Sequence, residues 1–277
     1  MPPNAVWKNL KGQGPAAHFY HANGFALDAY QPLLEQINKK LALSALALRP
    51  TWPGCGFPPK SRDWQLYADD LIAFVEQQYT LPIIGIGHSM GATCTILAAE
   101  KRPDLFKALV LIEPAMVSCA LAAFFRLMPK VLVNMVGPAK STLKRQDKWS
   151  SREAFRAHCR KFPGYKRFND AAFDALARAG VVETPDGNFT LVFSKVWEAH
   201  NYTQPPNVMD NLQGLTMPCA AIRGKPALFF TDKLWQEWQR RCPQSVFLED
   251  TRYGHLFPLE NPQACGNLIF DGLSKIL

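Results

Sequence analysis

The chain has 277 residues, of which 48% are hydrophobic and 19% charged, and its formal net charge at pH 7 is +8. This composition is typical of a globular protein with a large core, and it excludes a disordered or fibrous chain. The seven cysteines are scattered and form no C-x-x-C pair, which favours reduced thiols over a disulfide framework or a zinc site. We therefore expect a cytoplasmic protein.

The charge is distributed unevenly along the chain. Residues 140–167 contain ten Lys or Arg against two acidic residues, so this window carries as much net charge as the whole chain. A solvated helix face is the simplest interpretation, and attraction of an anionic substrate or an acidic membrane surface is the alternative. No recognised module accompanies the charge, so we expect no nucleic-acid partner. The sequence also predicts no signal peptide and no transmembrane segment.

Strand and helix patterns alternate from the amino terminus. Residues 16–22 form an apolar run that ends at Asn23-Gly24 and predicts a strand, and the amphipathic stretch 28–43 predicts a helix. The alternation continues with predicted strands over 41–48, 81–87 and 108–113 and predicted helices over 63–79 and 91–102.

The alternation stops after Pro114. Residues 115–210 show helical patterning, with 188–194 as a candidate strand, before the strand and helix pattern resumes. The later elements are predicted strands over 217–224 and 245–250 and predicted helices over 232–241 and from 261 onwards. Apolar strands that alternate with helices favour an α/β architecture with a mostly parallel sheet covered on both faces. We predict a core domain of residues 1–114 and 211–277 and a helical cap, or lid, of residues 115–210.

One serine stands out in Gly87-His88-Ser89-Met90-Gly91, between a predicted strand and a predicted helix. A serine on such a strained turn needs glycines two residues away on either side, and the turn presents its hydroxyl above the sheet. The amino terminus of the following helix directs N–H groups at the same point, which favours negative charge on an attacked carbonyl. Ser89 is therefore the candidate nucleophile, and this chemistry needs no cofactor and no metal.

A serine hydroxyl needs a base, and His255 follows the predicted strand 245–250 in a loop before the last helix. The backbone N–H groups of Met90 and Phe25 are the candidate oxyanion hole, because they follow the serine and the first strand. The alternative is that Gly85 to Gly91 form a loosened dinucleotide-binding fingerprint. Its third glycine comes one residue late, and this interpretation leaves His255 unexplained.

Together, H-A-N-G-F at 21–25, G-H-S-M-G-A at 87–92 and G-H-x-x-x-x-E-N-P at 254–262 resemble the motifs of α/β-hydrolase-fold serine hydrolases, in the lipase, esterase and C–C hydrolase group. The resemblance implies the α/β-hydrolase fold with a helical cap inserted after the sixth strand of the family's sheet. It also implies a catalytic triad and a serine esterase of the carboxylic ester hydrolase class (EC 3.1.1). Only about 20 residues precede the oxyanion loop, so one or both leading antiparallel strands are expected to be short or missing.

The acid of the triad departs from the family pattern. Members usually carry an Asp three residues after the glycine that ends the penultimate strand, but here Lys225-Pro226-Ala227 follow Gly224. Glu113, at the end of the predicted strand 108–113, is the first candidate, since a strand end is a rigid platform. Asp232 is the second candidate, and Asp250 or no acid at all stays open. The missing Asp also keeps open a non-catalytic small-molecule binder on the same fold.

The cap should select the substrate, because binding loops gather over the carboxyl ends of parallel strands. Its apolar segment 119–138 suggests an acyl pocket or a lid helix, although packing of the cap against the core is the simpler interpretation. We expect a small ester or acyl substrate, with an anionic or lipid-like one as an option, and a monomer or a homodimer. The candidate substrate-contacting residues are Asn23, His88, Phe124, Phe125 and Trp197.

Overall fold

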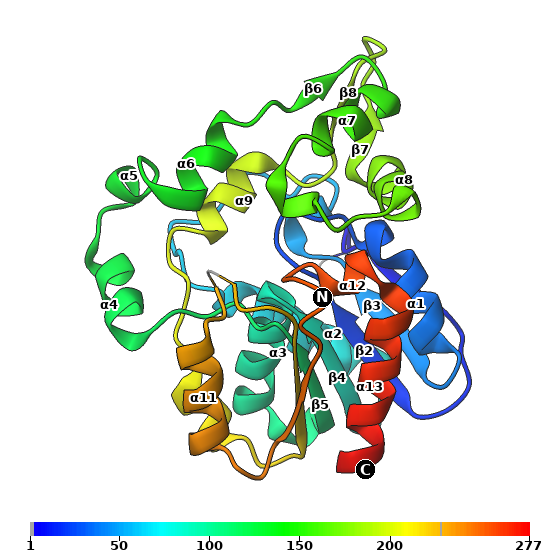
Figure 1. Cartoon of the computed structure of the whole chain (residues 1–277), viewed down its shortest axis with the longest axis vertical. Helices are drawn as coiled ribbons and strands as arrows, with labels where there is room; N and C mark the ends of the chain where they lie inside the picture. Colours follow the sequence, from blue (N-terminus) through cyan, green and yellow to red (C-terminus); the bar gives the residue numbers. More distant parts are fainter. Residues whose placement is uncertain (1–2, 228) are drawn as a thin grey trace.

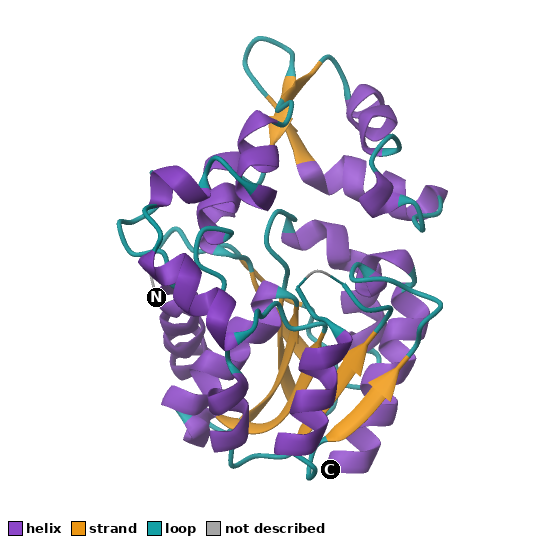
Figure 2. Cartoon of the chain, turned by 60° about the vertical axis from the view of Figure 1, so that its left-hand side comes forward, coloured by secondary structure: helices purple, strands orange, loops and turns teal. Residues whose placement is uncertain are grey.

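A seven-stranded sheet forms the centre of the computed structural model, which describes residues 3–227 and 229–277. The strand order is β1-β3-β2-β4-β5-β9-β10, and every neighbouring pair is parallel except β1 and β3. Figure 2 shows these strands side by side in the lower part of the molecule. The strands are β1 (Trp7–Asn9), β2 (Ala16–Tyr20), β3 (Ala42–Leu46), β4 (Ile83–His88), β5 (Phe106–Ile112), β9 (Cys219–Arg223) and β10 (Val246–Glu249).

Helices cover both faces of this sheet, which confirms the predicted architecture. On one face α1 packs against α13, and on the other α2 packs against α3. The central strand β4 is buried along its whole length, as expected for an apolar strand between two helix layers. The helices of this part are α1 (Gln31–Asn38), α2 (Gln65–Gln78), α3 (Met90–Lys101), α11 (Asp232–Arg241), α12 (Phe257–Glu260) and α13 (Pro262–Ile276).

Two predictions near the amino terminus are decided by the structure. A short strand, β1, precedes β2 in the described residues, so one leading antiparallel strand is present. The helix predicted over 28–43 was too long, because α1 ends at Asn38 and Leu43 pairs with Ala17 in the sheet. The apolar run that starts near Leu41 gains more as a buried strand than as an extension of a surface helix.

The segment between β5 and β9 forms a cap above the sheet (Figure 1). It contains three short antiparallel strands in the order β6-β8-β7, of which only β8 lies inside the predicted candidate strand. The sequence predicted a helical cap with one candidate strand; β6 and β7 were not predicted, because strands of two or three residues are too short to show alternation. The elements are α4 (Cys119–Leu127), α5 (Lys130–Val133), α6 (Gly137–Lys144), β6 (Lys148–Trp149), α7 (Arg152–Cys159), α8 (Asp170–Gly180), β7 (Val181–Glu183), β8 (Phe189–Leu191), α9 (Lys195–Asn201) and α10 (Met209–Gly214).

The chain returns to the core at α10, which contacts α3 and α11. Residue 211, the predicted start of the second core segment, lies inside this helix, and the division into two domains stays a prediction. On the opposite side the cap rests on the core through α8, which contacts the 3-10 turn Leu27–Tyr30. Across residues 3–227 and 229–277, none of the helices combines the length and the apolar character that crossing a membrane requires.

Candidate active site

Ser89 occupies a strained turn between β4 and α3. Its φ of 54° lies in the left-handed region, which a residue with a side chain seldom adopts. The flanking glycines make this turn possible. A Cβ on Gly87 would lie 2.5 Å from the Cα of Ala92, and a Cβ on Gly91 would collide with the carbonyl oxygen of Tyr20. The turn therefore holds the Ser89 hydroxyl at the carboxyl end of the central strand.

Ser89, His255 and Glu113 form a continuous chain of hydrogen bonds. Nε2 of His255 lies 2.9 Å from Oγ of Ser89, and Nδ1 lies 3.1 Å from Oε2 of Glu113. Because an ionised carboxylate only accepts, Nδ1 carries the proton and Nε2 is free to accept the serine proton. The Glu113 side chain is fully buried, while that of His255 is 21% exposed. This is the arrangement in which a histidine acts as a base toward serine.

Glu113 reaches the imidazole from the end of β5, the strand beside β4. Its backbone also has a positive φ, 49°, and its N–H donates to the carbonyl of Ile222 on β9. The second carboxylate oxygen accepts the N–H of Gly224 at 2.5 Å. Thus one oxygen of Glu113 is held by the backbone and the other faces His255.

The other candidate acids lie elsewhere. Asp232 is 61% exposed and pairs with Arg223 at 2.8 Å. Asp250 pairs with Arg252 at 2.6 Å, and this guanidinium holds the pKa of the Asp250 carboxyl below its usual range. Of the three acids, only Glu113 is hydrogen-bonded to His255 in the described structure.

The two residues predicted to supply the oxyanion donors line one small cavity together with Ser89. Phe25, Met90 and Ser89 all contribute to its lining. Within residues 3–227 and 229–277, the backbone N–H groups of Phe25 and Met90 donate to no other protein group. Met90 begins α3 and Phe25 lies in the loop after β2, and an unpaired N–H at either place can donate to an oxygen that gains negative charge.

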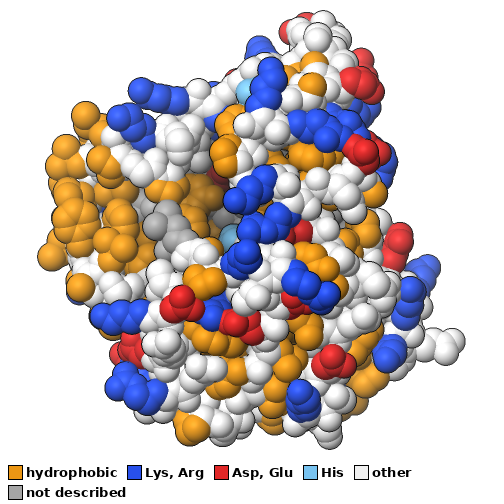
Figure 3. Space-filling model, viewed as in Figure 1, with side chains coloured by type: hydrophobic (Ala, Val, Ile, Leu, Met, Phe, Trp, Pro, Cys, Tyr) orange, Lys and Arg blue, Asp and Glu red, His pale blue; other side chains and the backbone are white. Residues whose placement is uncertain are grey.

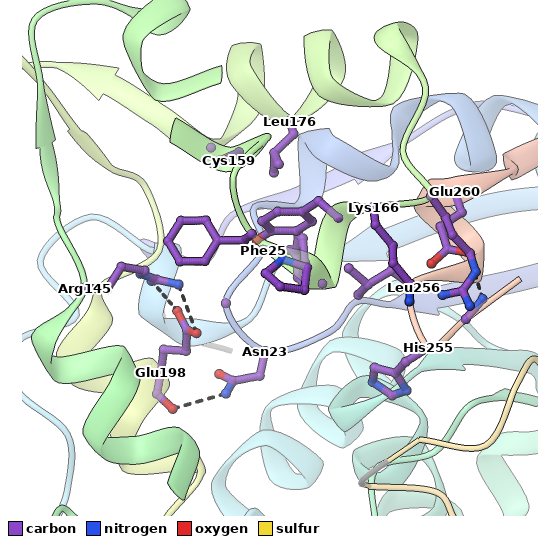
Figure 4. Close-up of a pocket in the computed structure, with 18 of the residues that line it drawn as sticks. Asn23, Phe25, Arg145, Cys159, Lys166, Leu176, Glu198, His255, Leu256 and Glu260 are labelled. Carbon is purple, nitrogen blue, oxygen red and sulfur yellow. Dashed lines mark hydrogen bonds and ion pairs between the residues drawn. The ribbon is translucent and has the colours of Figure 1, made fainter. Parts of the chain in front are cut away.

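Two adjoining cavities meet at His255. The smaller has a volume of about 80 Å³ and contains Ser89, and the larger, of about 700 Å³, extends between the cap and the core. Figure 4 shows the larger one, with Cys159 and Leu176 of the cap on one side and His255 on the other. The two share Asn23, Phe25, Tyr202, Phe229, His255 and Leu256 as lining residues.

A model of the alpha/beta hydrolase family matches residues 19–267 of the chain. The chain belongs to this family. One relative, the abhydrolase domain-containing protein ACTT2 of Alternaria alternata, is 24% identical over 231 residues, which cover 70% of this chain and 84% of that protein. A second, 2-(acetamidomethylene)succinate hydrolase of Mesorhizobium japonicum (strain LMG 29417 / CECT 9101 / MAFF 303099), is 29% identical over 106 residues, 37% of each chain.

Solved structures resemble this hydrolase over almost its whole length. The crystal structure of E-2-(acetamidomethylene)succinate hydrolase has a TM-score of 0.77 at 17% identity and covers 98% of this chain and 99% of that one. A thermophilic esterase from Thermogutta terrifontis has a TM-score of 0.68 at 18% identity, with 98% and 93% coverage. At these identities the likeness shows the fold, and the alpha/beta-hydrolase fold predicted from the sequence is confirmed.

The hydrolase supports its histidine loop through a second histidine. His88 is fully buried under the site; its Nε2 donates to the carbonyl of His255 at 2.9 Å and its Nδ1 accepts from the Tyr30 hydroxyl at 2.7 Å. Burial lowers the pKa of His88 well below its usual value, so the ring stays neutral. His88 does not line either cavity described above, and its place indicates a positioning role rather than the predicted substrate contact.

The other residues predicted to contact substrate differ in whether they line a cavity. Asn23 lines both cavities, and its amide donates to the carbonyl of Glu198 at 3.1 Å. Trp197 is buried but donates to the carbonyl of Gly56 instead. Phe124 and Phe125 line neither cavity; α4 turns Phe124 outward, and its side chain is 51% exposed. Figure 3 shows hydrophobic side chains gathered at the left, where Figure 1 places α4 and α5.

Sequence reasoning missed several of the residues that shape the two cavities. Trp64, Tyr202 and Phe229 come from the segment before α2, from the end of the cap and from the loop after β9. No periodicity in the sequence connects these positions; Tyr202 and Phe229 become neighbours only in the fold, where their rings stack at 5.7 Å.

Charged side chains line the larger cavity beside its aromatic residues. Arg145 forms an ion pair with Glu198, drawn in Figure 4. Burial raises the pKa of the Glu198 carboxyl, and the guanidinium opposes this rise. Lys166, Arg167 and Lys225 also line the cavity, and Figure 3 shows basic side chains beside a hollow between cap and core. Within the described chain no cluster of three or more His, Cys, Asp or Glu is placed to hold a metal ion.

Proposed function

We propose that this protein is a serine hydrolase that cleaves an ester or related acyl bond. The observation that carries the proposal is the unbroken hydrogen-bonded chain from Ser89 through His255 to Glu113. A fully buried carboxylate behind the histidine both fixes its tautomer and stabilises the imidazolium that forms during the reaction.

The proposed cycle follows from these contacts. Oγ of Ser89 attacks the carbonyl carbon while its proton moves to Nε2 of His255. The carbonyl oxygen becomes an oxyanion beside the N–H groups of Phe25 and Met90. The bond from the carbonyl carbon to the leaving group breaks, and His255 passes the proton that it took from Ser89 to the leaving atom. Water then attacks the acyl-enzyme with His255 as base, and the acid is released from Ser89.

An ester or thioester fits this site better than substrates that need a carboxylate nucleophile, because the residue at the turn is a serine. By their names the relatives include an esterase, an acyl-CoA thioesterase and a succinate-derivative hydrolase, so the leaving group must be inferred from this chain's own cavities. The basic lining of the larger cavity supports the anionic option among the substrates predicted from the sequence.

Labelling with a fluorophosphonate tests the proposal directly, since the reagent bonds only to an activated serine hydroxyl. We expect labelling of the wild-type protein, mapped by mass spectrometry to the peptide with Ser89, and none in Ser89→Ala. Ser118→Ala is a matched control, because Ser118 caps α4 in the cap and should leave labelling intact. A folded wild-type protein that takes up no label would refute the enzyme and favour the non-catalytic binder.

A further inference from the structure

The cavity that contains the nucleophile is small. Ser89 lines the cavity of about 80 Å³ and is absent from the lining of the larger one, so the carbonyl that it attacks must enter the smaller space. For comparison, an engineered apolar cavity of roughly 150 Å³ in another protein binds benzene. The space at Ser89 therefore admits a carbonyl with a few additional carbon atoms and excludes a long or aromatic group.

The walls of the small cavity are fixed. Trp64 is 4% exposed, and its Nε1 donates to the carbonyl of Asn201 at 3.0 Å. Met90 and Ala115 are also buried. Well-packed protein interiors resist expansion by even one methylene group. A substrate with a longer acyl chain would therefore have to displace these side chains.

His255 lines both cavities, so the residues close to it indicate which half of the substrate occupies which cavity. His255 must pass its proton from Ser89 to the leaving atom, so the leaving group lies on the His255 side of the serine. Gly254 and Glu260, close to His255 along the chain, line only the larger cavity of the two. The acyl group then points away from His255 into the small cavity, and the leaving group extends into the large one.

The larger cavity has the character of a site for an anionic group attached to an apolar body. Its volume of about 700 Å³ falls in the range of ligand pockets, roughly 300–1,000 Å³. Arg145 and Glu198 neutralise each other, which leaves Lys166, Arg167 and Lys225 against Glu260. The aromatic residues in the lining are Phe25, Trp149, Phe155, Phe162, Tyr165, Phe193, Tyr202 and Phe229.

We propose that the substrate is a short-chain acyl ester or thioester whose leaving group is large, partly apolar and anionic. This inference rests on the proposed serine hydrolase. The bond that breaks joins the carbonyl carbon to the leaving oxygen or sulfur, and the leaving atom receives the proton that Ser89 gave to His255. Hydrolysis of the acyl-enzyme releases a short carboxylic acid.

The first test varies the acyl chain at constant leaving group. We would measure kcat/KM for the 2-naphthyl esters of acetate, butyrate and hexanoate, after mapping the fluorophosphonate label to Ser89. We expect kcat/KM to fall at least tenfold from acetate to hexanoate. Equal or faster cleavage of the hexanoate ester would overturn the inference, whereas an unlabelled Ser89 would refute the proposed function itself.

Variants of the small cavity sharpen this test. Trp64→Leu enlarges the cavity and should raise the hexanoate-to-acetate ratio of kcat/KM at least fivefold. Ala115→Val reduces it and should lower the butyrate-to-acetate ratio, which keeps the idea testable if Trp64→Leu fails to fold. Trp238→Phe is the matched control, since this buried tryptophan of α11 lines neither cavity described here. An unchanged ratio in both folded cavity variants would contradict the inference.

The second test concerns the charge of the leaving group. We expect 6-sulfo-2-naphthyl acetate to have a lower KM than 2-naphthyl acetate, and this preference should fall at least threefold in Lys166→Gln or Lys225→Gln. Lys140→Gln is the control, because Lys140 is exposed on α6 and lines neither of the two cavities. The KM values of 6-carboxy-2-naphthyl acetate and 6-phospho-2-naphthyl acetate then show which anion on the leaving group is preferred. Equal KM values for neutral and anionic esters would overturn the anionic part of the inference.

Discussion

The substitution Glu113→Gln tests the identity of the third catalytic residue with almost no change in shape. Oε1 of Glu113 accepts the N–H of Gly224, so the amide oxygen of a glutamine must take that place. The amide NH₂ then faces Nδ1 of His255, which has to accept rather than donate. The proton of the neutral imidazole moves to Nε2, where it points at Ser89 and blocks acceptance of the serine proton.

The size of the effect follows from the geometry. The carboxylate oxygen and Nδ1 are 3.1 Å apart, so an imidazolium gains about 5 kcal/mol from the carboxylate at an effective dielectric constant of about 20. Loss of this stabilisation in the transition state corresponds to a fall of about 10⁴-fold in kcat. A triad carboxylate changed to its amide elsewhere lowers kcat by about the same factor.

The assay is kcat on 2-naphthyl acetate together with the second-order rate of fluorophosphonate labelling. Both should fall by about four orders of magnitude in Glu113→Gln, while the thermal unfolding midpoint confirms that the variant is folded. Asp232→Asn is the control and should retain activity within threefold, because Asp232 pairs with Arg223 and not with His255. A Glu113→Gln protein within tenfold of the wild type, or an equal loss in Asp232→Asn, would refute the reasoning.

Three further predictions concern stability. Glu198→Gln leaves the Arg145 charge without its partner and should lower the free energy of unfolding by about 3 kcal/mol in urea; a loss below about 1 kcal/mol would contradict this. Gly91→Ala should cost about 3 kcal/mol or prevent folding, since its Cβ meets the carbonyl oxygens of Tyr20 and His21; a normal unfolding midpoint would argue against this packing. Burial lowers the pKa of His21 to about 4, so between about pH 6 and pH 4 the unfolded state binds one more proton at this residue, and His21 alone lowers stability by about 1.4 kcal/mol per pH unit. Burial also lowers the pKa of His18 to about 3 and that of His88 well below its usual value, so the whole protein loses stability more steeply. In urea unfolding at pH 7, 6 and 5, His21→Gln should make this loss shallower by about the His21 share, and an unchanged pH dependence would contradict the prediction.

The core sheet could be predicted from the sequence because its strands are long enough to show a pattern. Each predicted core strand has a counterpart in the structure, and the mostly apolar β4 and β5 were the clearest. The cap was harder to predict. Its strands β6 and β7 contain two and three residues, and they exist because they pair with β8 rather than because of a local pattern.

The same contrast holds for the site. Ser89 and His255 lie in short motifs whose residues are neighbours in sequence, so the sequence was enough to single them out. Phe124 was predicted to contact substrate because its segment is apolar, yet α4 exposes half of this side chain to solvent. Hydrophobicity alone does not say which partner a side chain has. The small cavity at Ser89 is formed by residues from seven parts of the chain, and only the fold brings them together.

The position of the acid has a structural reason. β4, β5 and β9 are consecutive in the sheet, so their ends place Ser89, Glu113 and Gly224 side by side. A Cβ on Gly224 would lie 2.8 Å from the carbonyl oxygen of Gly254, so a glycine is needed where β9 meets the histidine loop. The N–H of Lys225 then donates to Tyr253 at 2.8 Å and fastens that loop to the strand. With the loop held in this way, the carboxylate of Glu113, directly after β5, reaches Nδ1 of His255. The end of β9 supplies the N–H of Gly224, which orients that carboxylate.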